Sequence, residues 1–207
     1  MNTGNTGRLI TLEGIDGAGT STQHARLIES LRQQGREVVA TREPGGTPLG
    51  EKLRGLLLSD AMNLETEALL MFAARREHLA QVILPALERG AWVVCDRFVD
   101  ASIAYQGAGR GLALSKLEQL ADWVLGKLRP DLTLLFDVPV ALAMQRLRAN
   151  TPNPDRFEQE QQDFFERVRQ GYLDIAAREP GRVCIIDASQ SLFDVNKQLD
   201  EALIRYC

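Results

Sequence analysis

Short apolar runs alternate along the chain with longer segments in which apolar residues recur every three or four positions. The short runs are typical of strands buried on both faces of a parallel sheet, and the longer segments have the period of an amphipathic helix. The predicted strands are residues 8–13, 37–41, 91–96, 131–137 and 182–187. The predicted helices are residues 21–34, 48–58, 64–88, 102–106, 114–128, 139–148, 157–177 and 192–206. This alternation predicts an α/β fold with a five-stranded parallel sheet and helices on both faces.

Two segments interrupt the regular pattern. Residues 107–111 contain three glycines and are predicted as a flexible turn. Residues 149–155 contain two prolines and two asparagines and are predicted as a loop. A chain of 207 residues is an ordinary length for one domain. We therefore expect a single domain over residues 1–207, with a small lid at about residues 147–157.

Composition excludes several classes of function. The net charge of −4 argues against a general nucleic-acid binder, whose footprint is usually basic. No apolar run approaches the ~20 residues that span a bilayer, and residues 1–7 are polar, unlike a signal peptide. The three cysteines are widely spaced and form no zinc or disulfide pattern. We expect a cytoplasmic protein that binds neither nucleic acid nor membrane.

A glycine-rich segment, Gly-Ile-Asp-Gly-Ala-Gly-Thr-Ser-Thr, lies between the first predicted strand and the first helix. Gly14 and Gly19 have the separation found in a phosphate-binding loop, and Ser21 stands where the magnesium-binding hydroxyl belongs. Successive backbone N–H groups in such a loop form a cradle for phosphates. Thr20 occupies the position of the motif's lysine and offers only a neutral hydrogen bond. The simplest alternative is a glycine turn that only starts a helix. The predicted nucleotide-binding residues are Gly14, Ile15, Asp16, Gly17, Ala18, Gly19, Thr20, Ser21, Thr22 and Arg146.

Charged residues follow other predicted strands at the same edge of the sheet. In an open α/β sheet, ligands bind beyond the carboxyl ends of the strands. Arg42, Glu43 and Pro44 follow the second strand, and Asp96 and Arg97 follow the third. A carboxylate at a strand end can hold Mg²⁺ together with Ser21, and the adjacent guanidinium can grip a phosphate. A capping aspartate with an ordinary surface ion pair is the alternative.

Two further groups of side chains are candidates for binding. Arg146, Arg148 and Arg156 flank the loop at residues 149–155 and could close over a triphosphate as an internal arginine finger. Arg146 and Arg148 would equally suit a solvated helix C-terminus. Phe72 and Arg75 lie on one predicted helix, where an aromatic beside an arginine could stack on a base and hydrogen-bond to it. A phenylalanine at helical spacing is also typical of a core. His24 and His78 receive no role.

These blocks together resemble the thymidylate kinase family, whose members phosphorylate dTMP to dTDP with ATP and Mg²⁺. The resemblance covers nearly the whole chain. It rests on residues 14–22, 41–47, 71–75, 96–98, 104–107, 129–131 and 155–158. It implies the fold of the phosphate-loop nucleoside triphosphatases and a role in dTTP synthesis.

The resemblance also implies roles for individual residues. Asp16 would contact the 3′-hydroxyl side of dTMP, and Arg97 would hold the dTMP phosphate and order the magnesium shell. Either Phe72 or Met71 would stack on thymine, and Arg75 would hydrogen-bond to the thymine edge. The implied substrate-binding residues are Arg42, Glu43, Pro44, Phe72, Arg75, Arg97, Ser102, Tyr105 and Gln106. The last three would fix the base and exclude a 2′-hydroxyl, and Pro44 would follow a cis peptide bond.

The family has two designs, and the sequence resembles the bacterial one. Gly17 stands where the other design has an arginine, and the bacterial design has its catalytic arginine in the lid, here Arg156. The implied catalytic residues are Arg156, Arg97 and Asp16. Such kinases are commonly homodimers packed through long helices. Adenine would lie near Arg146 and residues 187–189.

Thr20 departs from the family pattern and has three explanations. In the first, Thr20 is a natural variant and the lid arginines supply the positive charge that the lysine would provide. In the second, Thr20 is a substitution in an otherwise ordinary kinase. In the third, the chain is a degenerate nucleotide-binding paralogue without turnover. Every other expected residue is present, which favours a kinase with weakened ATP handling. A kinase for another nucleoside monophosphate is the competing enzymatic hypothesis.

Overall fold

The computed structural model describes residues 7–150 and 154–206, and within them five strands form one parallel sheet. The strands are β1 (Arg8–Glu13), β2 (Val38–Arg42), β3 (Trp92–Asp96), β4 (Leu132–Asp137) and β5 (Val183–Asp187). Their order in the sheet is β2-β3-β1-β4-β5. The predicted α/β fold is confirmed. Residues 151–153 of the predicted lid lie outside the described residues.

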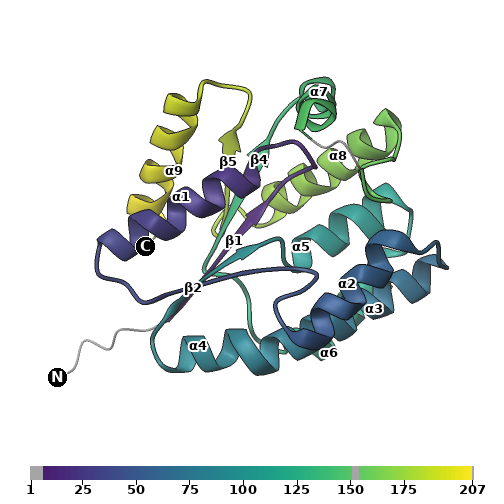
Figure 1. Cartoon of the computed structure of the whole chain (residues 1–207), viewed down its shortest axis with the longest axis horizontal. Helices are drawn as coiled ribbons and strands as arrows, with labels where there is room; N and C mark the ends of the chain where they lie inside the picture. The colour runs from purple at the N-terminus through teal and green to yellow at the C-terminus, as the bar shows by residue number, and fades with distance from the viewer. Residues whose placement is uncertain (1–6, 151–153, 207) are drawn as a thin grey trace.

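Helices connect the strands and cover the sheet on both sides. Figure 1 shows α1 and α9 on one side and α3, α5, α6 and α8 on the other. The α-helices are α1 (Thr20–Gln33), α2 (Pro48–Ser59), α3 (Leu64–His78), α4 (Leu84–Glu88), α5 (Val99–Ser102), α6 (Leu114–Leu125), α7 (Val140–Asn150), α8 (Gln162–Arg178) and α9 (Leu192–Tyr206). Two π-helical segments are η1 (Leu79–Ile83) and η2 (Ile103–Gly109). None of the described helices combines the length and apolar character needed to cross a membrane.

The three inner strands are buried on both faces, as their unbroken apolar runs predict. In β1, Leu9, Ile10 and Leu12 have no exposed surface, and in β3 Val93 and Val94 have none. A strand with no solvent face has no reason to alternate apolar and polar residues, so its sequence reads as a continuous run. The sheet therefore holds the end of β1 rigidly beside the end of β3.

The segment predicted as a flexible turn at residues 107–111 is largely helical, and the prediction is wrong there. The π-helix η2 continues through Gly109, whose backbone packs against α8. A Cβ atom at Gly109 would lie 2.7 Å from side-chain atoms of Phe164 and Val168, and one at Gly171 would lie 2.6 Å from Ala108. These glycines allow the two helices to pack closely. Local sequence rules do not include such tertiary contacts and predict a turn wherever glycines cluster.

The long helix predicted over residues 64–88 is divided by η1. Pro85 lacks an amide hydrogen and cannot donate to the carbonyl group four residues earlier, and the wider π-helical turn directly precedes it. The helix predicted to start at residue 157 starts at Gln162 instead. Asp155 accepts hydrogen bonds from the backbone N–H groups of Phe157 and Glu158 and forms a separate turn.

Candidate active site

The glycine-rich segment forms a loop between the end of β1 and the start of α1. Gly14, Gly17 and Gly19 have φ angles of 156°, 83° and 93°. A Cβ atom at Gly17 would lie 2.2 Å from the carbonyl oxygen of Ala143, so only glycine fits there. The first residue of α1 is Thr20, and the N-terminus of this helix therefore faces the loop. Such a helix start attracts anions.

Two cavities open at this edge of the sheet. We call the first the loop cavity; its described lining is Ile15, Asp16, Gly17, Ala18, Gly19, Thr20, Ser21, Thr22, Gln23, Arg54, Asp96, Arg97, Arg146, Leu147, Asn150, Asp155, Glu158, Ala188, Gln190, Leu192 and Val195. We call the second the helix cavity; its described lining is Asp16, Arg42, Glu43, Pro44, Arg54, Leu58, Met71, Arg75, Asp96, Arg97, Phe98, Ala101, Ser102, Tyr105, Gln106, Asp155 and Phe157. Five charged residues belong to both linings, so the cavities meet at Asp16, Arg54, Asp96, Arg97 and Asp155.

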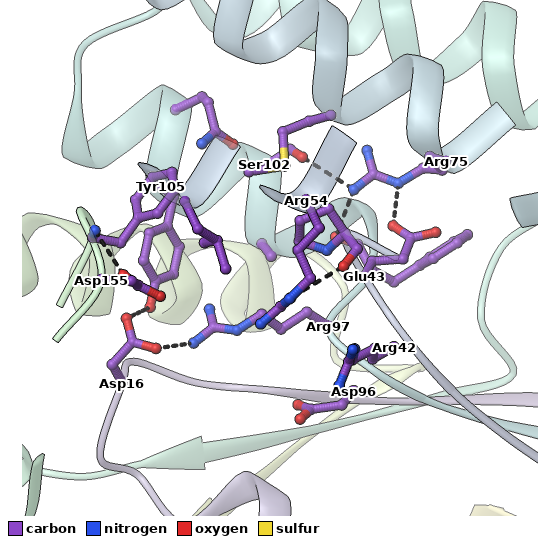
Figure 2. A pocket seen from close by; sticks show the side chains of 17 residues that line it. Asp16, Arg42, Glu43, Arg54, Arg75, Asp96, Arg97, Ser102, Tyr105 and Asp155 are labelled. Atoms are coloured by element: carbon purple, nitrogen blue, oxygen red, sulfur yellow. Dashed lines mark hydrogen bonds and ion pairs between the residues drawn. The ribbon is translucent and has the colours of Figure 1, made fainter. Parts of the chain in front are cut away.

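Arg97 is held at this meeting point in a strained backbone conformation. Its φ of 66° is the one positive value among the described non-glycine residues. Its Nη2 donates to Asp16 at 2.7 Å, and the hydroxyl group of Tyr105 donates to the other oxygen of Asp16 at 2.8 Å (Figure 2). Burial acts to lower the pKa of Arg97, but nearby Tyr105 and Asp16 outweigh it and raise that pKa well above its usual value. A fixed guanidinium is thus presented to both cavities.

Arg75 carries a buried donor with no partner in the described part of the chain. Its Nε donates to Glu43 at 2.7 Å, and its Nη2 donates to the carbonyl oxygen of Phe98 at 3.0 Å and to Ser102 at 3.1 Å (Figure 2). Its Nη1 is buried and has none. Because an unsatisfied buried donor is costly, this N–H group is available for a ligand in the helix cavity.

His78 received no role from the sequence, yet it helps to position this site. It is completely buried, and its Nδ1 lies 2.9 Å from Glu43. Its Nε2 lies 2.6 Å from the hydroxyl group of Thr41. Glu43 is therefore fixed between His78 and Arg75. The only sequence signal is the spacing of three residues, which places Arg75 and His78 on one face of α3.

Asp96 and Ser21 fit a magnesium site. Asp96 ends β3, and its Oδ1 is buried with no hydrogen-bond partner among the described residues. Ser21 lines the loop cavity, which Asp96 also lines. No group of three or more potential metal-ligating side chains occurs among the described residues. Mg²⁺ is commonly held by one or two protein oxygen ligands together with phosphates and water, and the oxygen atoms of Asp96 and Ser21 are ligands of this kind.

The structure brings most of the predicted residues to the two cavities. Residues 15–22 and Arg146 line the loop cavity, where Arg146 donates to the carbonyl oxygen of Ala188 at 3.0 Å. The peptide bond before Pro44 is cis, as expected. Met71 lines the helix cavity, whereas Phe72 is buried outside that lining with its ring 4.7 Å from the Arg75 guanidinium carbon. The implied substrate-binding residues in the lining are Arg42, Glu43, Pro44, Arg75, Arg97, Ser102, Tyr105 and Gln106.

Arg156 does not lie where the sequence led us to expect it. It is absent from the described linings of both cavities. Its Nη2 lies 2.7 Å from Glu67, and its Nε and Nη2 donate to the carbonyl oxygen of Leu57 at 3.2 and 2.9 Å. A buried carboxylate and the negative end of α2 together hold its guanidinium. A contact between Arg156 and the transferred phosphoryl group stays a prediction.

Arg54 is a cation that sequence reasoning missed. It lies on α2, lines both cavities and donates to the carbonyl oxygen of Pro44 at 3.1 Å. Burial and the neighbouring Arg42 lower its pKa. Arg54 reaches the site from the middle of α2, where no strand end or motif marks it in the sequence.

Comparison with known proteins identifies the family. The profile described as thymidylate kinase matches residues 12–199. The chain is 59% identical to a thymidylate kinase of Bordetella petrii over 197 residues, covering 95% of each chain. It is 60% identical to one of Nitrosomonas europaea, covering 94% of this chain and 91% of that one. The structure of thymidylate kinase from Ehrlichia chaffeensis superposes with a TM-score of 0.76 at 36% identity, covering 95% and 98%. The chain belongs to the thymidylate kinase family.

Proposed function

We propose that this protein transfers the γ-phosphoryl group of ATP to dTMP, giving dTDP and ADP. The observation that carries the proposal is the meeting of the two cavities at Asp16, Asp96 and Arg97. One cavity has the phosphate-binding loop and the other has the unpartnered donor of Arg75. A nucleoside triphosphate in the first and a nucleoside monophosphate in the second would bring their phosphates together at the shared wall.

The protein's part in this reaction is positioning and charge. The backbone N–H groups of the loop and the N-terminus of α1 would hold the ATP phosphates, with Arg146 beside adenine. Arg97, Arg54 and Arg42 would hold the dTMP phosphate in line with the γ-phosphoryl group. A phosphate group has a second pKa near ~6 and is already largely anionic at neutral pH, so no general base is needed. Mg²⁺ bound at Asp96 and Ser21 would neutralise charge on the phosphate oxygens.

The helix cavity supports a pyrimidine monophosphate as acceptor. The free N–H group of Arg75 would donate to the C4 carbonyl of thymine, and Met71 would lie against the base. Tyr105 and Asp16 form a hydrogen-bonded pair where the sugar would lie, beside Arg97 at the phosphate. Phe72 would act through Arg75, whose guanidinium it packs against.

A coupled ADP-release assay tests the proposal. With ATP and Mg²⁺, dTMP is expected to turn over faster than dUMP, dCMP and AMP. Faster turnover of another monophosphate would make this a different nucleotide kinase. Binding of ATP and dTMP without turnover, unchanged in Thr20→Lys, would identify a non-catalytic paralogue.

The proposal includes a homodimer. A groove between α3 and α6 is lined by Leu69 and Trp123, which are 55% and 83% exposed. Exposed apolar side chains gathered on two helices are typical of a helix-packed interface. Sedimentation of the native chain is expected to give a dimer, and of Trp123→Glu a monomer. A native monomer at micromolar concentration would refute this part.

A cytoplasmic location is also part of the proposal. Cys95 and Cys184 are free thiols, as expected in a reducing compartment. Fractionation of cells that express the chain without a tag tests it, and activity in an oxidising compartment would contradict it.

A further inference from the structure

Glu67 is a buried carboxylate on α3 that belongs to neither cavity lining but touches the residues around the helix cavity. Its side chain is 1% exposed. Its Oε1 accepts a hydrogen bond from Gln106 Nε2 at 2.8 Å and lies 3.3 Å from Arg110 Nε. Its Oε2 lies 2.7 Å from Arg156 Nη2. A single carboxylate thus joins an amide of the helix cavity to two arginines, Arg110 and Arg156.

The chemistry of the carboxylate decides which way the Gln106 amide is turned. An ionised carboxylate only accepts hydrogen bonds, so the group of Gln106 that faces Glu67 must be its NH₂. The carbonyl oxygen of Gln106 then points to the other side. Gln106 lines the helix cavity, and its Nε2 already donates to Glu67, so its Oε1 is the atom of this amide that can face the cavity. The cavity is therefore offered an acceptor from Gln106 and a donor from Arg75.

The arginines keep the Glu67 carboxylate in this arrangement. Arg156 is also fixed by the carbonyl oxygen of Leu57, and Arg110 forms an ion pair with Glu160 at 2.9 Å. Both guanidinium groups also contact the ring of Phe157: its centroid lies 4.6 Å from the guanidinium carbon of Arg156 and 5.2 Å from that of Arg110. Glu67 cannot turn toward one partner without losing another.

We propose that Glu67 is a positioning residue that selects the base by fixing the orientation of the Gln106 amide. An acceptor beside a donor matches a base with N3–H next to a C4 carbonyl, which is the edge of thymine and uracil. Cytosine has N3 as an acceptor next to an amino group, so both of its hydrogen bonds would be mismatched. The proposal rests on the proposed function and adds the source of its base selectivity.

The test replaces the carboxylate of Glu67 by an amide of nearly the same size and shape. In Glu67→Gln, Arg156 lies closer to residue 67 than Arg110 does, at 2.7 against 3.3 Å, and so holds the new amide oxygen; the new NH₂ then faces Gln106. Gln106 must then turn its oxygen toward residue 67 and its NH₂ toward the cavity. The ratio of the dissociation constants for dCMP and dTMP, measured by calorimetry, is expected to fall by about tenfold or more, the equivalent of one hydrogen bond.

A second variant separates orientation from simple damage. In the exchange Glu67→Gln with Gln106→Glu, the carboxylate at 106 can only accept, so the cavity again presents an acceptor. Selectivity for dTMP is expected to return to within about threefold of the native value. The control is Glu77→Gln, which removes a carboxylate from the same helix outside both cavity linings. It is expected to leave the ratio unchanged.

The outcomes distinguish this inference from the proposed function. If the native chain binds neither dTMP nor dCMP, the proposed function fails. If it prefers dTMP and folded Glu67→Gln keeps the same preference, only the role of Glu67 fails. An exchange variant that folds but does not regain selectivity also overturns it. The native chain gives a check independent of the variants: the Gln106 NH₂ resonances should shift little when dTMP binds, and a large shift would refute the orientation.

Discussion

Thr20→Lys is expected to raise the rate of phosphoryl transfer. Thr20 is half-buried at the start of α1 and lines the loop cavity, so a lysine there would extend toward the ATP phosphates. One charge about 4 Å from a phosphoryl oxygen contributes about 4 kcal/mol at an effective dielectric constant of about 20. Arg54, Arg97 and Arg146 already line the cavity and reduce the gain to about 3 kcal/mol. This predicts a rise in kcat of about a hundredfold.

The assay is ADP release at saturating ATP and dTMP, with single-turnover rates to isolate the chemical step. Thr20→Met is the matched control, because it adds length without charge, and its kcat is expected to stay within about threefold of the native value. Equal rates in all three chains would show that the arginines already supply the charge. A rise in Thr20→Met as large as in Thr20→Lys would refute the electrostatic argument and point to packing.

Three further substitutions test other parts of the structure. Burial, with the nearby charge of Asp100, raises the pKa of Glu13 from 4.5 to about 8, so the folded state binds the extra proton between these values. Stability to urea should therefore fall by up to about 1.4 kcal/mol per pH unit as pH rises toward 8, and Glu13→Gln should flatten this slope; an equal slope in both chains would exclude Glu13. Arg75→Met leaves Glu43 with a buried charge paired only to histidine, and the free energy of unfolding should fall by about 3–5 kcal/mol, whereas a loss under about 1 kcal/mol would contradict the pairing. Gly109→Ala places a Cβ atom 2.7 Å from a side-chain atom of Phe164, and the free energy of unfolding should fall by about 1–3 kcal/mol. An unchanged midpoint of chemical denaturation would show that α8 moves aside easily.

The local elements were predictable because each carries its own signal. The five strands begin and end within one residue of their predicted bounds, since each apolar run is bounded by polar residues or glycine. The glycine-rich loop between β1 and α1 was predictable because its glycines have the spacing of a known motif. The π-helices were not, because η2 depends on how Gly109 packs against a helix more than fifty residues later.

The residues of the site also divide into those that the sequence predicted and those that only the structure shows. The sequence predicted that Asp96 and Arg97 lie at the cavities, because residues that follow a central strand lie at the edge of the sheet where ligands bind. The sequence could not show that Arg156 forms an ion pair with Glu67, because Glu67 lies on α3, far from Arg156 in the chain. It also missed Arg54 and His78, which reach the site from the sides of helices.

The succession of strands and helices and the glycine-rich loop followed from the sequence alone, because each depends on residues close together in the chain. The family followed from short blocks of sequence spread over most of the chain, which can be recognised without the folded structure. The tertiary structure decided which charges meet: Arg97 with Asp16, Arg75 with Glu43, and Arg156 with Glu67. Each long polar side chain has several possible partners, and only the packed positions of the helices bring one of them within hydrogen-bonding distance.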